Sequence, residues 1–231
     1  DALPILGVTA LITNVAIQKT TFKCEIPYML LITAVLLVMG MTGNEITFIE
    51  GVILWILFIA YLFYLYILAK KGNDSGDEQS VKLYPVWKCL LFIVLGGVCV
   101  VIGSQFVVNG ATTIARACGM SERFIGLTIV AFGTSLPELV TSVSAARKGN
   151  AGIAIGNIVG SNIFNILFVI GTVALICPVP FESRFVIDTV VAILCGVLLW
   201  GGTIRHKELR KPCGVVMLLC YAAYFVYLAA M

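Results

Sequence analysis

A glutamate, a serine and an asparagine interrupt two neighbouring apolar stretches of this chain. Glu138 lies in the run TIVAFGTSLPELVTS, and Ser161 and Asn165 lie in GNIVGSNIFNILF. A carboxylate in apolar surroundings is costly, so its presence indicates function rather than packing. Thr134 precedes Glu138 by four residues, as Ser161 precedes Asn165, which places each pair on one helix face. Carboxylate, hydroxyl and amide oxygens without His or Cys suit Ca²⁺ or Na⁺ rather than zinc or copper.

Pro137 is expected to add backbone oxygens to the same set. Proline has no N–H to donate to the carbonyl of Gly133, and the nearby carbonyl of Ala131 is a further candidate. A single Ser or Thr in an apolar helix more often bonds its own backbone, but two such clusters fit packing alone poorly. Asn162 is open to a capping or bridging role, and Asn157, near a predicted helix end, is interpreted as structural.

The composition predicts an integral membrane protein. Of the 231 residues, 60% are hydrophobic and only 12% are charged, against about a quarter charged in soluble domains. The net charge of +3 is small and dispersed, which argues against a nucleic-acid partner. The eight cysteines contain no CxxC pair and are interpreted as small apolar packing residues.

Windows of membrane length predict one partial and seven full spanning segments. Only helices are expected, because lipid cannot satisfy exposed backbone groups. The partial segment is 1–17, and the full ones are 26–43, 47–69, 86–109, 123–146, 151–176, 185–204 and 212–231.

The basic residues predict the orientation of these segments. Most Lys and Arg residues fall in alternate connectors on one side, and only Arg116, Arg123 and Arg184 fall on the other. The positive-inside rule then places the polar linker 70–85 in the cytoplasm, with the plasma (cell inner) membrane as the expected location. Acidic residues at the segment edges, Asp188 among them, are expected to be solvated.

The chain contains an internal repeat. DALPILGVTALITNV at the start aligns without gaps to NILFVIGTVALICPV, and Gly51, Tyr61 and Tyr64 match Gly214, Tyr224 and Tyr227 at an offset of 163 residues. Corresponding segments are an odd number of crossings apart, so the two halves have opposite topology. Inverted repeats of this kind build many secondary transporters, with the binding site between the halves.

The repeat also predicts the domain organisation. Residues 1–69 are expected to be the remainder of the first repeat, 70–85 a cytoplasmic linker, and 86–231 the second repeat. The alignment predicts that about 78 residues of the first repeat precede residue 1.

The stretch GLTIVAFGTSLPELVTSVSAARKGNAGIAIGNIVGSNIFNIL closely resembles the second alpha-repeat of the calcium/cation antiporter superfamily, in particular prokaryotic-type sodium/calcium exchangers. The motifs GTSLPE and GNxxGSN occur in the family's order on adjacent segments. The resemblance implies an all-α integral membrane protein with an inverted-repeat transporter fold of ten helices. This chain would carry about the last seven and a half of them.

The same resemblance implies a set of metal-ligating residues. Glu138 would supply the carboxylate shared by Ca²⁺ and Na⁺, and a second glutamate is expected in the segment before residue 1. Asp1 is included because the repeat places it at the first-half equivalent of Asn165. The implied ligands are Glu138, Thr134, Ser135, the carbonyl of Ala131, Ser161, Asn165 and Asp1.

The implied function is secondary active exchange of Ca²⁺ for Na⁺ by alternating access. Neither catalysis nor a cofactor is expected: the partners would be the two transported ions, the lipid bilayer and the missing N-terminal segment. Coupling to H⁺ or K⁺ is the first alternative, although potassium-coupled members usually carry an aspartate at the position of Asn165. A cation channel and a membrane enzyme are the others. The inverted repeat argues against the channel, and the lack of a His, Cys or acid pair on one face argues against the enzyme.

Overall fold

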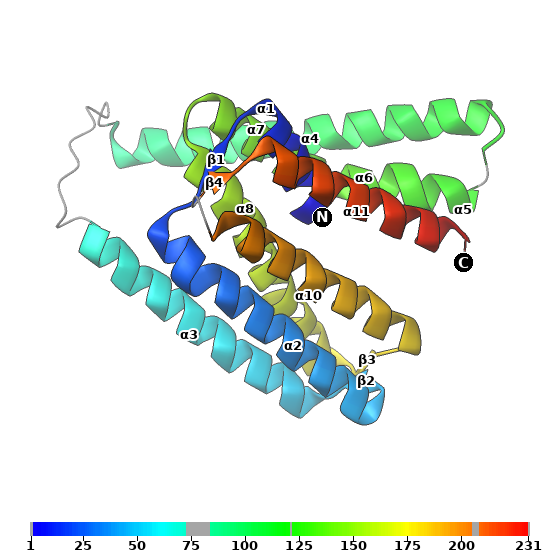
Figure 1. Ribbon diagram of the computed structural model, residues 1–231, viewed down its shortest axis with the longest axis horizontal. Helices are drawn as coiled ribbons and strands as arrows, with labels where there is room; N and C mark the ends of the chain where they lie inside the picture. Colours follow the sequence, from blue (N-terminus) through cyan, green and yellow to red (C-terminus); the bar gives the residue numbers. More distant parts are fainter. Residues whose placement is uncertain (1, 73–83, 121, 205–207, 231) are drawn as a thin grey trace.

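The computed structural model describes residues 2–72, 84–120, 122–204 and 208–230, and helices dominate it (Figure 1). The α-helices are α1 Ala2–Ile12, α2 Ile26–Gly43, α3 Phe48–Gly72, α4 Val86–Ala117, α5 Glu122–Ile125, α6 Ala131–Thr134, α7 Leu136–Arg147, α8 Ala151–Phe164, α9 Gly171–Ile176, α10 Ser183–Thr203 and α11 Lys211–Ala230. The π-helical segments are η1 Thr21–Glu25, η2 Gly126–Val130 and η3 Asn165–Ile170. The two-residue strands are β1 Val15–Ala16, β2 Glu45–Ile46, β3 Val179–Pro180 and β4 Glu208–Leu209.

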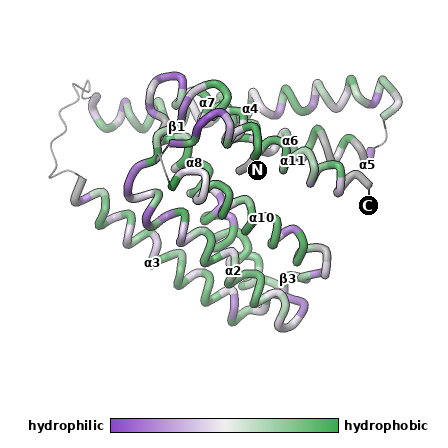
Figure 2. The backbone as a smooth tube through the Cα atoms, in the orientation of Figure 1, coloured by the Kyte–Doolittle hydropathy of each residue, from purple (hydrophilic) through white to green (hydrophobic). Residues whose placement is uncertain are grey.

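Several helices are long and apolar enough to cross a membrane. Hydrophobic residues run along most of each long helix (Figure 2). In the described residues, five segments meet the length and composition of a spanning helix: Thr21–Gly43, Phe48–Lys70, Val86–Ala117, Gly152–Ile176 and Phe185–Thr203. A shorter apolar helix covers Lys211–Tyr227. The prediction of an all-α, multi-pass integral membrane protein is confirmed.

The predicted continuous span 123–146 is wrong in one respect, because the chain breaks near its middle. Helix α6 ends at Thr134, Ser135 adopts φ −93° and ψ −2°, and α7 begins at Leu136 with Pro137 in its first turn. Proline cannot donate a hydrogen bond to the preceding turn, but it is well suited to start a new one. Pro137 therefore ends one helix and begins another at the level of the predicted site.

Two short antiparallel ribbons join the ends of the repeats. Strand β1 pairs with β4, with Val15 opposite Leu209, and β2 pairs with β3, with Ile46 opposite Val179. In the repeat alignment β1 corresponds to β3 and β2 to β4, so exchanging the halves converts one ribbon into the other. Helices follow the same rule, since α1 packs along α11 and α9 packs along α3. The inverted-repeat fold is confirmed by these pairings.

The core of the molecule lies where α8 crosses α1 and α2. Leu6, Ile26, Ile32, Ile155 and Ile163 are buried there almost completely. Every one of these side chains is aliphatic, so the centre is held by close apolar packing rather than by ion pairs. Helix α8, which carries one of the two polar motifs, is thereby fixed firmly in the structure.

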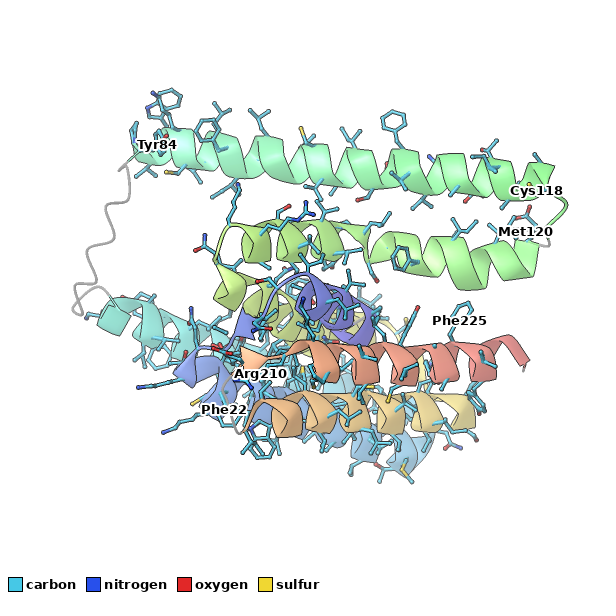
Figure 3. The ribbon with its side chains drawn as sticks, turned by 45° about the horizontal axis from the view of Figure 1, so that its top comes forward. Phe22, Tyr84, Cys118, Met120, Arg210 and Phe225 are labelled. Atoms are coloured by element: carbon cyan, nitrogen blue, oxygen red, sulfur yellow. The ribbon has the colours of Figure 1, made fainter. Side chains whose placement is uncertain are left out.

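Helix α4 is the most exposed long helix. It runs beside the α5–α7 segment, from near Tyr84 to Cys118, and many of its side chains project away from the other helices (Figure 3). Ala115 is its one buried residue. An apolar helix with so much exposed surface needs lipid or further protein around it. Its inner side, however, reaches the break between α6 and α7.

Candidate ion-binding site

The break between α6 and α7 positions the polar residues of the GTSLPE motif. Ser135 lies at the break itself, and Glu138 lies in the first turn of α7. Backbone N–H groups at the start of a helix have no partner within the helix and give that end a partial positive charge. An acidic side chain in the first turn of a helix complements this partial charge, as Glu138 does in α7.

Two buried oxygens at this break lack hydrogen-bond partners. Among the described residues, neither Oγ of Ser135 nor Oε2 of Glu138 has one, and Ser135 is only 4% exposed. Leaving a buried polar group unsatisfied costs about 1–3 kcal/mol, and native proteins contain few such groups. A dehydrated cation would satisfy both oxygens, because carboxylate and hydroxyl oxygens are the ligands that Ca²⁺ and Na⁺ use.

The carboxylate of Glu138 faces a pocket between α4, α7 and α8. Its volume is about 280 Å³, and its polar lining comes from Glu138, Thr141 and Asn157. Gly96 and Gly97 of α4 form part of the opposite wall. The pocket is large enough for a cation that keeps part of its water shell, since one water occupies about 30 Å³.

Asn157 connects α8 to α7 beside this pocket. Its Nδ2 donates to Thr141 Oγ1 at 3.0 Å, and it also lies 3.2 Å from Ser142 Oγ and 3.4 Å from the carbonyl oxygen of Glu138. The sequence predicted a structural role for Asn157, and these contacts are of that kind. Asn157 also lines the pocket of Glu138, which the sequence did not predict. Thr141 was not singled out from the sequence either. The available signals were its position three residues after Glu138 and the position of Asn157 four residues before Ser161.

Ser161 and Asn165 lie further along the same face of α8. Ser161 Oγ donates to the carbonyl of Ile158 at 3.0 Å, and Asn165 is exposed where α8 passes into η3. Neither residue lines the pocket of Glu138. Each step of four residues advances the helix by about 6 Å, so Asn157, Ser161 and Asn165 form a ladder of polar groups that begins at this pocket.

The remaining predicted ligands do not line the pocket of Glu138 in the described part of the structure. Thr134 ends α6 and is exposed. Ala131 begins α6, and its side chain lies outside the described part of the structure. Asp1 also lies outside the described residues. Helix α6 packs on α4, because a Cβ added to Gly133 would lie 2.1 Å from Cγ2 of Val108. The roles of Thr134, Ala131 and Asp1 as ligands stay predictions.

The described residues contain no group of three or more His, Cys, Asp or Glu side chains that could hold a metal ion. Among the described residues, a cation at Glu138 would therefore meet one carboxylate together with neutral oxygens. Such a mixed oxygen set is typical of hard cations, which exchange quickly, and not of tightly held transition metals.

An inverted-repeat membrane protein with a broken helix that presents a buried carboxylate belongs, by its architecture, to the secondary transporters. The model of the sodium/calcium exchanger protein family matches residues 1–67 and 88–230. The chain belongs to this family, and hence to the calcium/cation antiporter superfamily, which confirms the resemblance found in the sequence. Exchangers are membrane transporters rather than a class of enzymes.

Three known proteins illustrate the relationship. The chain is 33% identical over 218 residues to the membrane protein MJ0091 of Methanocaldococcus jannaschii, with 94% of this chain and 69% of that protein covered. It is 38% identical over 142 residues to the sodium/calcium exchanger MaX1 of Methanosarcina acetivorans, with 61% and 41% covered. A solved structure of the sodium-calcium exchanger NCX_Mj, soaked with zero Na⁺ and Ca²⁺, has a TM-score of 0.78 and 31% identity, and the match covers 98% of this chain and 72% of that one.

Proposed function

We propose that this protein exchanges Ca²⁺ for Na⁺ across a membrane, with Glu138 as the carboxylate that the two ions share. The observation that carries the proposal is the pair of buried oxygens without partners, Oγ of Ser135 and Oε2 of Glu138, at the break of a helix. Family membership supports the reaction class, and the names of MaX1 and NCX_Mj support sodium and calcium as the ions.

The proposed coupling follows from competition for the same oxygens. The carboxylate of Glu138 can bind either Ca²⁺ or Na⁺, but both ions cannot occupy the same coordination sphere. Ser135, Thr134 and the carbonyl of Ala131 would complete the sphere from one helix. Ser161 and Asn165 would contribute from α8, and Asp1 from the first repeat. Release of one ion then permits binding of the other, and an inward sodium gradient would drive Ca²⁺ outward.

Alternating access requires an element that can move beside the site. Helix α4 lines the pocket of Glu138 through Gly96 and Gly97 but packs only on the α5–α7 segment among its major contacts. Helix α8 is held in the core. A displacement of α4 along α7 would therefore change which side of the pocket is open while α8 stays in place. In this proposal Glu138 belongs to the second repeat, 86–231, and the linker 70–85 joins it to the remainder of the first repeat, 1–69.

Calcium uptake into sealed vesicles tests the proposal. The intact natural protein is reconstituted into vesicles loaded with Na⁺ and diluted into medium without Na⁺, and the variants Glu138→Gln and Glu122→Gln are treated alike. We expect uptake that requires internal Na⁺, is lost in Glu138→Gln and persists in Glu122→Gln, whose side chain is exposed. Full uptake by Glu138→Gln would contradict the assignment of the site.

The same vesicles distinguish the alternative couplings. Uptake driven equally well by a proton gradient without Na⁺ would assign the protein to proton/calcium exchange, and an absolute requirement for K⁺ would assign it to potassium-coupled exchange. Calcium flux without any counter-ion gradient would indicate a channel.

A further inference from the structure

A second cavity lies away from the pocket of Glu138, between α2, α8, α10 and α11. Its volume is about 230 Å³. The two cavities have no lining residue in common. Polar or polarisable side chains that line the second cavity are Thr33, Asn162, Asp188, Cys195, Tyr221 and Tyr224. Nothing in the proposed exchange at Glu138 makes use of this group.

Asp188 provides the charge in this cavity. The sequence placed Asp188 at a helix edge, where it was expected to be solvated, and that expectation is wrong. The side chain is half-buried, and its Oδ1 accepts a hydrogen bond from the hydroxyl of Tyr224 on α11. Asp188 is also the only acidic residue in the described lining of the cavity, and no Lys, Arg or His occurs there. Asp188 is therefore the one charged side chain in the described lining of this cavity.

Three of the oxygen-bearing side chains in the cavity use a proton on protein acceptors and keep lone pairs for a ligand. Tyr224 uses its proton on Asp188. Thr33 Oγ1 donates to the carbonyl of Met29 at 2.7 Å, and Asn162 Nδ2 donates to the carbonyl of Ile158 at 2.8 Å. The second oxygen of Asp188, Oδ1 of Asn162 and the lone pairs of the hydroxyls remain. A surface of acceptor oxygens with one negative charge attracts a cation and repels an anion.

We propose that this cavity binds a single Na⁺ ion, with Asp188 as the charged ligand and Asn162 and Thr33 as neutral ones. A carboxylate in a membrane protein is expensive to keep ionised without a partner. One monovalent cation balances one carboxylate, whereas protein Ca²⁺ sites draw on six to eight oxygens and usually on several carboxylates. The chemistry of the cavity thus favours Na⁺ over Ca²⁺.

The bound ion would act through α8. Asn162 follows Ser161 directly in this helix, so α8 carries the polar ladder of the transport site on one face and a ligand of the second cavity beside it. A Na⁺ ion that joins Asn162 to Asp188 of α10 and Thr33 of α2 would fix α8 against both neighbours. The ion is therefore a stabilising and positioning ion, separate from the ions that are transported.

The repeat supplies an internal control. Glu25 and Tyr61 stand at the positions that correspond to Asp188 and Tyr224, and they line a cavity with Tyr28 and Tyr64. That cavity has no amide or threonine among its described lining residues. It offers the charge without the neutral ligands, so we expect no comparable Na⁺ binding at Glu25.

The test uses the intact natural protein in detergent, with Glu138→Gln as the background so that the transport site is removed. Thermal unfolding is followed while NaCl replaces choline chloride at constant ionic strength. We expect Na⁺ to raise Tm in Glu138→Gln, the added Asp188→Asn change to abolish that rise, and the added Glu25→Gln change to leave it intact. Because no transport is measured, failure of the proposed exchange would not alter this result.

Several outcomes would overturn the proposal. The first is that Na⁺ does not raise the Tm of Glu138→Gln. The second is that Na⁺ raises the Tm of Glu138→Gln/Asp188→Asn by the same amount, and the third is that K⁺ raises the Tm of Glu138→Gln as much as Na⁺ does. A rise produced by lowering the pH without Na⁺ would assign the cavity to a proton instead. If Asp188→Asn fails to fold, Thr33→Val is introduced into the Glu138→Gln background instead. We expect this double variant to fold and to need a higher Na⁺ concentration for the same rise in Tm. An unchanged Na⁺ dependence would contradict the proposed site.

Discussion

Gly7 of α1 and Gly214 of α11 meet where the two helices cross. A Cβ added to Gly7 would lie 3.1 Å from the carbonyl oxygen of Gly214, and one added to Gly214 would lie 3.0 Å from the carbonyl oxygen of Gly7. Gly51 and Gly171 repeat the arrangement between α3 and α9, with a Cβ on Gly51 3.0 Å from the carbonyl of Gly171. Each crossing joins one repeat to the other, and small residues let the backbones approach this closely.

Replacing Gly214 with alanine should destabilise the protein. The new methyl group would press on the backbone of α1 and lie 2.9 Å from Cβ of Ala10, and overpacking of this kind typically costs about 1–3 kcal/mol. The measurement is Tm in detergent. Gly103→Ala is the matched control, because a Cβ there meets no described atom within 4 Å. Equal Tm values for the two variants would contradict the proposed tight crossing.

Ser135→Ala should affect stability and function in opposite directions. Without ions, removal of a buried hydroxyl that lacks a partner should raise the free energy of unfolding by about 1–3 kcal/mol. Calcium uptake should require a higher Ca²⁺ concentration, since one ligand is lost. Ser142→Ala is the comparison, because Ser142 is fully buried but contacts Asn157. We expect Ser142→Ala to lower Tm; a fall in Tm for Ser135→Ala as well would argue against an ion ligand at Ser135.

Removal of Ca²⁺ should destabilise the natural protein but not Glu138→Gln. A ligand that binds only the folded state adds about 2.7 kcal/mol at a hundred times its dissociation constant. The experiment compares Tm in excess Ca²⁺ and in a chelator, both without Na⁺. Glu138→Gln should show one Tm in both conditions. A calcium-dependent shift that survives this substitution would place the ion elsewhere.

Asn157→Leu should loosen the contact between α7 and α8. The substitution leaves Thr141, Ser142 and the carbonyl of Glu138 without the amide that contacts them. We expect the free energy of unfolding to fall by about 1–3 kcal/mol, with weaker Ca²⁺ dependence of uptake because Glu138 is no longer held in place. Thr113→Val, which removes a bond of 2.8 Å within one exposed helix turn, should change neither quantity appreciably.

The carboxyl group of Glu122 should titrate at unusually low pH. A hydrogen bond from Arg116 lowers the pKa of Glu122, and the charge of the guanidinium acts in the same direction. The folded state therefore gains stability from this pair above the ordinary pKa of glutamate and loses it as the pH falls through the lowered value. Carboxyl ¹³C NMR measures the shift directly, and Arg116→Gln should return the pKa of Glu122 towards its ordinary value.

The class of fold could be predicted from the sequence because the internal repeat is detectable in the sequence itself. Gly51 and Gly214 align at a constant offset, and the same positions make equivalent crossings in the structure. The break at Ser135 was predicted only in part. Pro137 predicted a freed carbonyl, but a hydropathy window averages over the segment and cannot detect where one helix ends and the next begins.

Parts of the polar network depend on tertiary contacts that no local pattern contains. Asp188 of α10 accepts a hydrogen bond from Tyr224 of α11. The residues around Asp188 in the sequence indicate only that it lies near a helix end. Asn157 likewise joins Thr141 and Ser142 through the packing of α7 on α8. Spacing along one helix predicts which residues share a face, but not which face another helix will cover.

The crossed pairing of the repeats also constrains the order of synthesis. Helix α1 and strand β1 leave the ribosome long before β4 and α11, yet Val15 pairs with Leu209. Translation proceeds at about 5–20 residues per second, so the chain waits some 10–40 seconds between these two events. During that time the first segments must sit in the membrane or its insertion machinery without their partners. The contact between α1 and α11 can form only after α11 has been made, so this crossing is a late step of folding.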